Sequence, residues 1–240
     1  QTCALPISPM CVVAREAGEP LNLIEIGCSA GVLLVFDKFA YLLNQQGVIG
    51  NTDAAFLLEG ELNNGPELFI PHIGTRTGID LHTIDVRSEE ERRWLLALCF
   101  PELRAEQQRL SQALDVIAAS NVTMLEGDAL MHIDQALAAT PDPVCVFHSA
   151  CLFYWPVEAK RALEDRLLAA SHSRDIWRIS IEPSDTFDEW HKGRIGEDDD
   201  EQQASQRSGE IAITRYCQGT AERRVVGRPN ADYGCIDWFG

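Results

Sequence analysis

Residues 21–31 read L-N-L-I-E-I-G-C-S-A-G, and their pattern indicates the fold class. Its first six residues are mostly apolar, which is typical of a buried strand in a parallel sheet. Gly27 and Gly31 follow, and a helical pattern begins at Val32. A strand, a glycine turn and a helix in succession bring backbone N–H groups and a helix N-terminus to a nucleotide-like ligand. The stretch therefore predicts an α/β fold in which this turn is either a ligand site or a purely structural tight turn.

The residues between these glycines separate two kinds of ligand-binding turn. The dinucleotide fingerprint G-x-G-x-x-G is absent, because Ser29 stands where its second glycine would be. Glu25, followed by G-x-S-x-G, instead resembles motif I of class I S-adenosylmethionine-dependent methyltransferases. That resemblance implies that the acid lies near the amino group of the cofactor or near the adjoining loop. It also implies that the cofactor contacts the turn residues Gly27, Cys28, Ser29 and Gly31.

Composition bounds the size of the protein and its partners. A chain of 240 residues with 45% hydrophobic residues can bury one substantial core, which predicts a single domain over residues 9–240. The formal net charge of −17 opposes binding to nucleic acid or to anionic membranes, because phosphate contacts need clustered Lys and Arg. No apolar run is long enough to span a bilayer. We therefore expect neither a nucleic acid nor a membrane as partner.

The eight cysteines are scattered and form no Cys-x-x-Cys pair, which argues against a zinc ribbon and a redox pair. Four of them stand in apolar or turn contexts expected of buried free thiols, namely Cys28, Cys99, Cys145 and Cys151. No signal peptide is recognisable, so we expect a cytoplasmic protein. The histidines show no spacing typical of metal ligands, and we expect no metal site.

The first eight residues, Q-T-C-A-L-P-I-S, are interpreted as foreign to the natural protein. Reverse-translated, they spell a widely used short-read sequencing adapter. We interpret residues 1–8 as a library artefact and expect the natural start to be missing, which the absent initiator Met fits. We therefore expect this segment to pack against nothing.

The rest of the chain alternates strand-like and helix-like segments. Apolar runs predict five strands, ending near Ile26, Ile79, Leu125, His148 and Ile181. Helical periodicity predicts helices over residues 32–44, 88–98, 102–120, 130–139 and 156–170. Mobile insertions are expected near residues 45–75 and 184–209, the second because it contains an unbroken acidic run.

A pair of antiparallel strands closes the chain. Residues 210–217 and 223–227 read as a hairpin around Gly219. Five β-α units followed by such a pair predict a Rossmann-like class I methyltransferase fold. Its sheet would be mostly parallel and seven-stranded, with a C-terminal antiparallel hairpin and helices on both faces.

Several separated strings carry a family resemblance: L-I-E-I-G-C-S-A-G-V-L-L-V-F-D-K-F-A-Y, R-T-G-I-D-L-H-T-I-D-V, R-R-W-L-L-A-L-C-F-P-E, G-D-A and V-F-H-S-A-C-L-F-Y. Together with Gly234 and Trp238 they resemble the bacterial domain of unknown function family 2332. Val32-Leu33 departs from the Leu-Asn that the family favours at this point. The family's helical N-terminal region is lacking, which implies a truncated chain. The resemblance implies a methyltransferase-like fold and no particular substrate.

Acidic residues follow two of the expected strands. Asp80 ends the second strand, where methyltransferases hold the ribose hydroxyls, and a carboxylate can accept two hydrogen bonds from a diol. Glu59 is the alternative ribose acid, and a turn or cap role is the alternative for Asp80. Asp128, beside Ala129 in G-D-A, resembles the acid that accepts from the adenine amino group. Its alternative role is a cap of the following helix.

The candidate catalytic residues follow the fourth and fifth strands. His148 ends the fourth strand and could act as a general base, or could be a histidine hydrogen-bonded within the sheet edge. Tyr154 could wall a substrate pocket or simply pack. Glu182 ends the fifth strand and could orient substrate or form a salt bridge.

These patterns favour an S-adenosylmethionine-dependent methyltransferase acting on a small molecule or a protein group. Methyl transfer needs a nucleophile in line with the sulfonium, so the protein mainly supplies positioning and one base. A non-catalytic scaffold that binds a nucleoside-type ligand or a protein partner is the second hypothesis. An NAD-dependent oxidoreductase is the third, disfavoured by Ser29 and by the terminal hairpin. The sequence predicts no oligomeric state.

Overall fold

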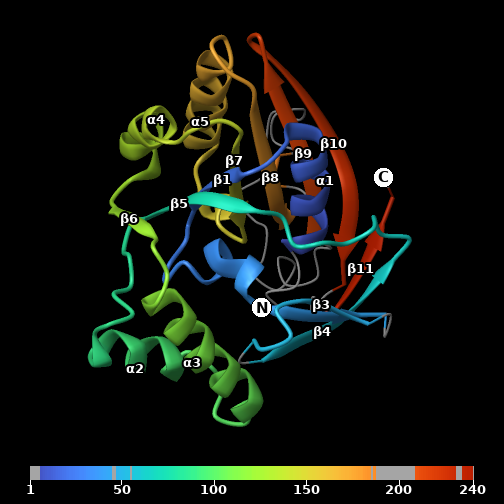
Figure 1. Cartoon of the computed structure of the whole chain (residues 1–240). Helices are drawn as coiled ribbons and strands as arrows, with labels where there is room; N and C mark the ends of the chain where they lie inside the picture. The colour runs from blue at the N-terminus through green and yellow to red at the C-terminus, as the bar shows by residue number, and fades with distance from the viewer. Residues whose placement is uncertain are drawn as a thin grey trace, which may run out of the picture.

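The computed structural model describes residues 6–44, 47–54, 56–184, 186–187, 209–230 and 234–239 (Figure 1). Its strands are β1 (Leu21–Ile26), β2 (Ala40–Leu43), β3 (Val48–Gly50), β4 (Leu57–Asn63), β5 (Ile73–Asp80), β6 (Thr123–Glu126), β7 (Val144–Ser149), β8 (Ile176–Pro183), β9 (Gly209–Cys217), β10 (Thr220–Pro229) and β11 (Cys235–Trp238). They form one mixed, mostly parallel sheet in the order β3-β2-β4-β11-β10-β9-β8-β7-β1-β5-β6. The α/β class predicted from the sequence is confirmed.

The helices are α1 (Ile7–Ala17), α2 (Glu89–Ala97), α3 (Arg104–Ala118), α4 (Ala129–Ala139) and α5 (Val157–Ala170), with the 3₁₀ helices η1 (Val32–Lys38) and η2 (Leu152–Tyr154). Within the part of the chain that the structure describes, no helix is both long and apolar enough to cross a membrane.

The centre of the sheet is the parallel set β6-β5-β1-β7-β8. All six residues of β1 are buried, as expected of a central parallel strand that is covered on both faces. β1 pairs with β5 on one side and with β7 on the other. From β1 the chain therefore builds outward first through β5 and β6, and then in the opposite direction through β7 and β8. The carboxyl ends of β1 and β7 thus form the topological switch point of the sheet.

Two apolar cores cover the two faces of the sheet. Alternate residues of a strand point to opposite faces, so Leu21 and Leu23 of β1 pack in one core and Ile24 and Ile26 in the other. The first core also includes residues of α1, η1 and α3, and the second those of α4 and α5. Helices therefore lie on both faces, as the sequence predicted (Figure 1).

The expected count of seven strands is wrong, because the described residues form 11 strands. Strands β2, β3, β4 and β11 extend the sheet beyond the hairpin. β4 makes this extension possible, since it pairs in parallel with β2 on one side and with β11 on the other. Part of the expected insertion at 45–75 is therefore paired sheet, while most of the one at 184–209 lies outside the described residues.

The single helix expected over residues 32–44 is also wrong. Val32–Lys38 is a 3₁₀ helix with a non-helical Val35, and Phe39 already has extended backbone angles. Ala40–Leu43 then forms β2. Nearly every residue of this run is apolar, so its pattern fits a strand as well as a helix, and pairing with β4 decides the outcome.

Other expected elements are confirmed. β9 and β10 pair antiparallel around Gly219, whose φ is +75°. The helix after Ser88 begins with that residue as N-cap, and its side chain accepts from the N–H of Glu91. Among the expected free thiols, Cys28 and Cys145 are buried, and the other two are only half-buried.

The expectation that residues 1–8 pack against nothing is wrong for the described part of that segment. Ile7 and Ser8 belong to α1 and are fully buried, and Ile7 joins the core beside Met10 and Val13. Residues 1–5 lie outside the described residues.

Candidate functional site at the carboxyl edge of the parallel strands

The glycine turn after β1 has an unusual backbone. Gly27, Ser29 and Gly31 all have positive φ, of +77°, +50° and +76°. This region is disfavoured for a residue with a Cβ, so Ser29 is held there by its surroundings. The N–H groups of Gly27 and Cys28 both donate to the carbonyl of Ile79, at 2.8 and 3.3 Å. The turn is therefore docked against the end of β5.

Asp80 fixes the middle of this turn. Its Oδ2 accepts from the N–H of Ser29 at 2.7 Å, and its Oδ1 from the N–H of His82 at 3.0 Å. Asp80 therefore lies against the glycine turn. Each carboxylate oxygen has two lone pairs, so both retain capacity to accept from a ligand. Glu59, the alternative ribose acid, lies instead on β4, away from the carboxyl end of β5.

Glu25 is a buried acid with one unsatisfied oxygen. Its side chain is only 3% exposed, and Oε2 has no hydrogen-bond partner within the described residues. The pKa of Glu25 is raised well above its usual range, mainly by burial and to a lesser extent by the Asp80 carboxylate. Glu25 is therefore a neutral carboxyl that can donate a hydrogen bond. Burial also raises the pKa of the neighbouring Cys28 thiol, which keeps it protonated.

The space beside Gly27 is filled by Cys151 from the loop after β7. A Cβ built on Gly27 would lie 2.4 Å from the Sγ of Cys151 and 2.8 Å from its Cβ. Burial raises the pKa of Cys151 to about 12, so the thiol is neutral. At Gly31 a Cβ would meet only side-chain atoms at 3.4 Å or more. Both glycines have a positive φ, but only Gly27 also leaves room for another part of the chain.

His148 and Glu182 form a buried pair at the ends of β7 and β8. The Nδ1 of His148 lies 2.7 Å from the Oε1 of Glu182, and both side chains are almost wholly buried. Burial lowers the pKa of His148, despite the opposing effect of Glu182. Burial would raise the pKa of Glu182, but the His148 hydrogen bond and the loop N–H groups outweigh it and leave that pKa lowered.

The protonation of this pair determines what His148 can do. A carboxylate only accepts, so Nδ1 carries the proton of the neutral ring and donates it to Glu182. The Nε2 of His148 is then an acceptor, and it has no hydrogen-bond partner in the described part of the chain. Such an atom can take up a proton, which is the chemistry of a general base.

Glu182 also organises the loop that carries Cys151. Its carboxylate accepts from the N–H groups of Cys151, Leu152 and Phe153 at 3.0–3.4 Å. The next residue, Tyr154, is 78% exposed, and its ring centroid lies 3.7 Å from that of Phe153. In this structure Glu182 thus positions a loop, and Tyr154 lies on the surface.

Asp128 and Ala129 lie at the start of α4. The Oδ1 of Asp128 accepts from the N–H of Leu130 at 2.8 Å, so the capping role is observed. Ala129 is buried. Two exposed apolar side chains near these strand ends were missed by the sequence reasoning, Leu81 directly after Asp80 and Met131 in the first turn of α4. In the sequence, each of these apolar residues stands within three positions after an acid at or just after a strand end, and this pattern could have indicated them.

The expected site residues fall on two faces of the sheet. Glu25 shares its face with Leu21 and Leu23, whereas His148 shares the opposite face with Val144 and Val146. The structure therefore brings Glu25, the glycine turn and Asp80 together, and His148 and Glu182 together. The two groups meet where Cys151 packs on Gly27.

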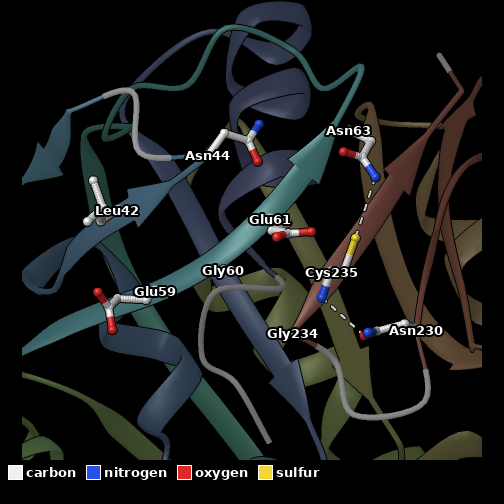
Figure 2. A pocket seen from close by; sticks show the side chains of 9 residues that line it. All are labelled: Leu42, Asn44, Glu59, Gly60, Glu61, Asn63, Asn230, Gly234 and Cys235. Carbon is white, nitrogen blue, oxygen red and sulfur yellow. Dashed lines mark hydrogen bonds between the residues drawn. The ribbon is translucent and has the colours of Figure 1, made fainter.

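A second polar region lies in the sheet extension. A pocket of about 800 Å³ lies between β2, β4 and β11 (Figure 2), and its lining residues are Leu42, Asn44, Glu59, Gly60, Glu61, Asn63, Asn230, Gly234 and Cys235. Glu59, Glu61 and Asn63 alternate with the buried Leu58 and Leu62, so the pocket lies on the solvent-facing side of β4. In the described ranges no three His, Cys, Asp or Glu side chains gather as a metal site.

Comparison with known proteins identifies the family. Residues 2–238 match a family described as uncharacterized proteins conserved in bacteria (DUF2332). The chain belongs to this family, and the family resemblance of its motifs is confirmed. No curated protein matches the chain.

Proposed function

We propose that this member of the family is an S-adenosylmethionine-dependent methyltransferase of the class I type, acting on a small molecule or a protein group. The observation that carries the proposal is the position of the glycine turn at the topological switch point between β1 and β7. In open α/β sheets, ligands bind in the crevice outside the carboxyl ends of the strands at this point. The nearest strand ends supply the acids expected for such a cofactor.

The residues around the turn fit the parts of the cofactor. The unpartnered Oε2 of Glu25 is a buried polar atom that the fold leaves unsatisfied, and a neutral carboxyl there can donate to a carboxylate or stabilise the turn. Asp80 retains lone pairs for the ribose hydroxyls. Asp128 caps α4 with one oxygen, which leaves the other for the adenine amino group.

The catalytic part of the proposal rests on His148. When bound, S-adenosylmethionine supplies a methyl group on a positively charged sulfur. His148 would accept a proton at Nε2 from the attacking group, and Glu182 would hold the ring through Nδ1 and stabilise the charge that develops. Because His148 is fully buried, an acceptor reaches Nε2 only after a covering segment moves.

A non-catalytic scaffold is the second candidate, and two contacts favour it. Cys151 fills the space beside Gly27, and both oxygens of Asp80 already accept from the backbone. These contacts stabilise the turn without any ligand. A scaffold of this kind would bind a protein partner or a nucleoside and transfer no methyl group.

Calorimetric titration with S-adenosylhomocysteine, S-adenosylmethionine and NAD tests the proposal. We expect both adenosyl ligands to bind and NAD to bind at least tenfold more weakly. Folding is verified first by a cooperative thermal melt. If a well-folded chain binds no adenosyl ligand, the methyltransferase proposal is contradicted and the scaffold hypothesis is favoured. Preferential binding of NAD would favour an oxidoreductase.

A further inference from the structure

The loop at residues 150–153, here called the gate loop, lies over the turn after β1. Its contact with Gly27 involves more than the sulfur of Cys151. The Cβ of Cys151 is itself 2.8 Å from the position that a Gly27 Cβ would take. Rotation about χ1 moves Sγ and leaves Cβ in place, so a side-chain rotation alone does not clear this space. Clearing it requires the backbone of the gate loop to shift.

Glu182 holds that backbone in place. The N–H groups of three consecutive residues of the loop donate to its carboxylate, and the Nδ1 of His148 donates to the same carboxylate. Hydrogen bonds to an ionised group are stronger than neutral ones, and Glu182 is only 3% exposed. Glu182 is therefore the side chain of β8 that holds the backbone of the loop, while the fully buried Leu152 anchors the loop in the second core.

The loop begins with a strained residue. Ala150 has a φ of +50°, and its N–H donates to the carbonyl of Ile181 at 2.9 Å. A non-glycine residue in this conformation needs its surroundings to hold it there. Release of the Glu182 contacts would remove much of that support. The backbone angles of Ala150 are then expected to change, and the loop would move about this residue.

We propose that the gate loop closes the crevice beside Gly27, that Glu182 is its latch, and that a nucleoside-type ligand enters by displacing Cys151. The inference rests on the proposed function for the identity of the ligand, but the gate itself is a property of the loop. Opening also moves residues directly after His148, so the same movement that admits the ligand changes access to Nε2. Glu182 is a positioning residue in this scheme.

Alkylation of thiols tests the gate without any ligand. The full chain is treated with iodoacetamide at fixed pH, and the rate at each cysteine is followed by peptide mass spectrometry. We expect Glu182→Gln to raise the rate at Cys151 at least tenfold. Cys145 on β7 is the matched control, because it is fully buried away from the loop and its rate should stay unchanged.

The possible outcomes of this experiment decide the proposal. A rise at Cys151 alone that also occurs in Glu182→Asp, which retains the charge that raises the pKa of the Cys151 thiol, supports a local gate. No rise at either cysteine shows that Glu182 is not the latch, and an equal rise at both shows that it supports the whole fold; either result overturns the proposal. Should Glu182→Gln fail to fold, Glu182→Asp keeps the charge, shortens the side chain and takes its place in the same comparison.

Binding provides the second measurement. Cys151→Gly removes both Sγ and Cβ and should tighten S-adenosylhomocysteine binding about tenfold, whereas Cys151→Ala retains Cβ and should have a smaller effect. Equal affinities of wild type and Cys151→Gly would overturn displacement of Cys151. If neither protein binds the ligand, the proposed function fails, while the alkylation rates still decide whether the gate exists.

Discussion

The carboxyl edge around Gly27 and the pocket along β4 are both polar, but they differ in what fills them. At the carboxyl edge, polar atoms are buried, the backbone takes positive φ angles, and another part of the chain occupies the crevice. The β4 pocket is open, with a volume of about 800 Å³, and its acids Glu59 and Glu61 are exposed. The open β4 pocket is therefore the less constrained region.

This difference bears on where function resides. Strained backbone and unsatisfied buried groups lower stability, so they persist only where the surrounding structure holds them, and they concentrate at functional sites. Exposed acids on one face of a strand have a simpler origin, because a strand with one buried face presents polar residues to water. We therefore propose that function resides in the closed region, and the following variants test that proposal.

The largest effect is expected from Gly27→Val. The new side chain would clash with Cys151 and take a positive φ that β-branched residues avoid, so we expect the free energy of unfolding to fall by about 3–5 kcal/mol. Binding of S-adenosylhomocysteine should be lost. Gly18→Val is the matched control, because Gly18 has a φ of +91° and no atoms near its Cβ position. In Gly18→Val only the backbone strain is added, so the free energy of unfolding, measured in urea, should fall by about 1–3 kcal/mol.

Asp80→Ala should act mainly on binding. It removes charge-assisted hydrogen bonds of about 1.5–3 kcal/mol, which is roughly a tenfold to hundredfold loss of affinity in calorimetry. Asp85→Ala is the control, since Asp85 makes a similar bond to the N–H two residues on, at 2.9 Å, and lies in the same loop. If both variants bind normally, the carboxyl edge is not the nucleoside site.

Glu25→Gln should change the pH dependence of stability. The raised pKa of Glu25 means that its contribution is present below about 4.5 and is lost as the pH rises, because the unfolded chain then releases a proton that the folded chain retains. The loss is about 1.4 kcal/mol per pH unit until the folded group titrates. Relative to wild type, the variant should gain stability between pH 5 and 7 in urea unfolding. Parallel pH profiles would show that Glu25 is ionised in the folded protein.

The sequence predicted the central sheet well, because each of its strands is marked locally. The apolar runs before Gly27, Asp80 and His148 end in turn residues, and the helices between Asp80 and His148 show a clear period. The helix predicted over residues 32–44 is wrong for a physical reason. Their outcome depends on pairing of β2 with β4, and β4 in turn pairs with β11, which lies far along the chain. Such pairing leaves no local pattern.

The candidate site shows the same limit. Its acids were singled out from the sequence, because they lie at or just after strand ends and the strand ends meet at one edge. The contact of Cys151 with Gly27 was not, because nothing near either residue indicates the other. The placement of Glu25 and His148 on opposite faces follows from strand register and could have been derived, since Glu25 pairs with Phe147 and not with His148.

His148→Ala should have a small effect on cofactor binding. His148 lies on the opposite face from Glu25, so we expect affinity for S-adenosylhomocysteine to stay within about threefold while any methyl transfer falls. Calorimetry and a transfer assay measure the two separately. A loss of affinity larger than that of Asp80→Ala would mean that the nucleoside lies on the His148 face.

The smallest effect is expected in the β4 pocket, from Glu59→Gln with Glu61→Gln. Both carboxylates lie on the solvent-facing side of one strand in a protein with a net charge of −17, so their removal reduces repulsion. We expect the free energy of unfolding to change by no more than about 0.5 kcal/mol, in the stabilising direction, and the gain to shrink in 1 M salt. Affinity for S-adenosylhomocysteine should be unchanged. A clear loss of that affinity, in a variant as stable as wild type, would place the ligand in the open pocket and reverse the assignment, because no exposed acid there supports the fold of the carboxyl edge.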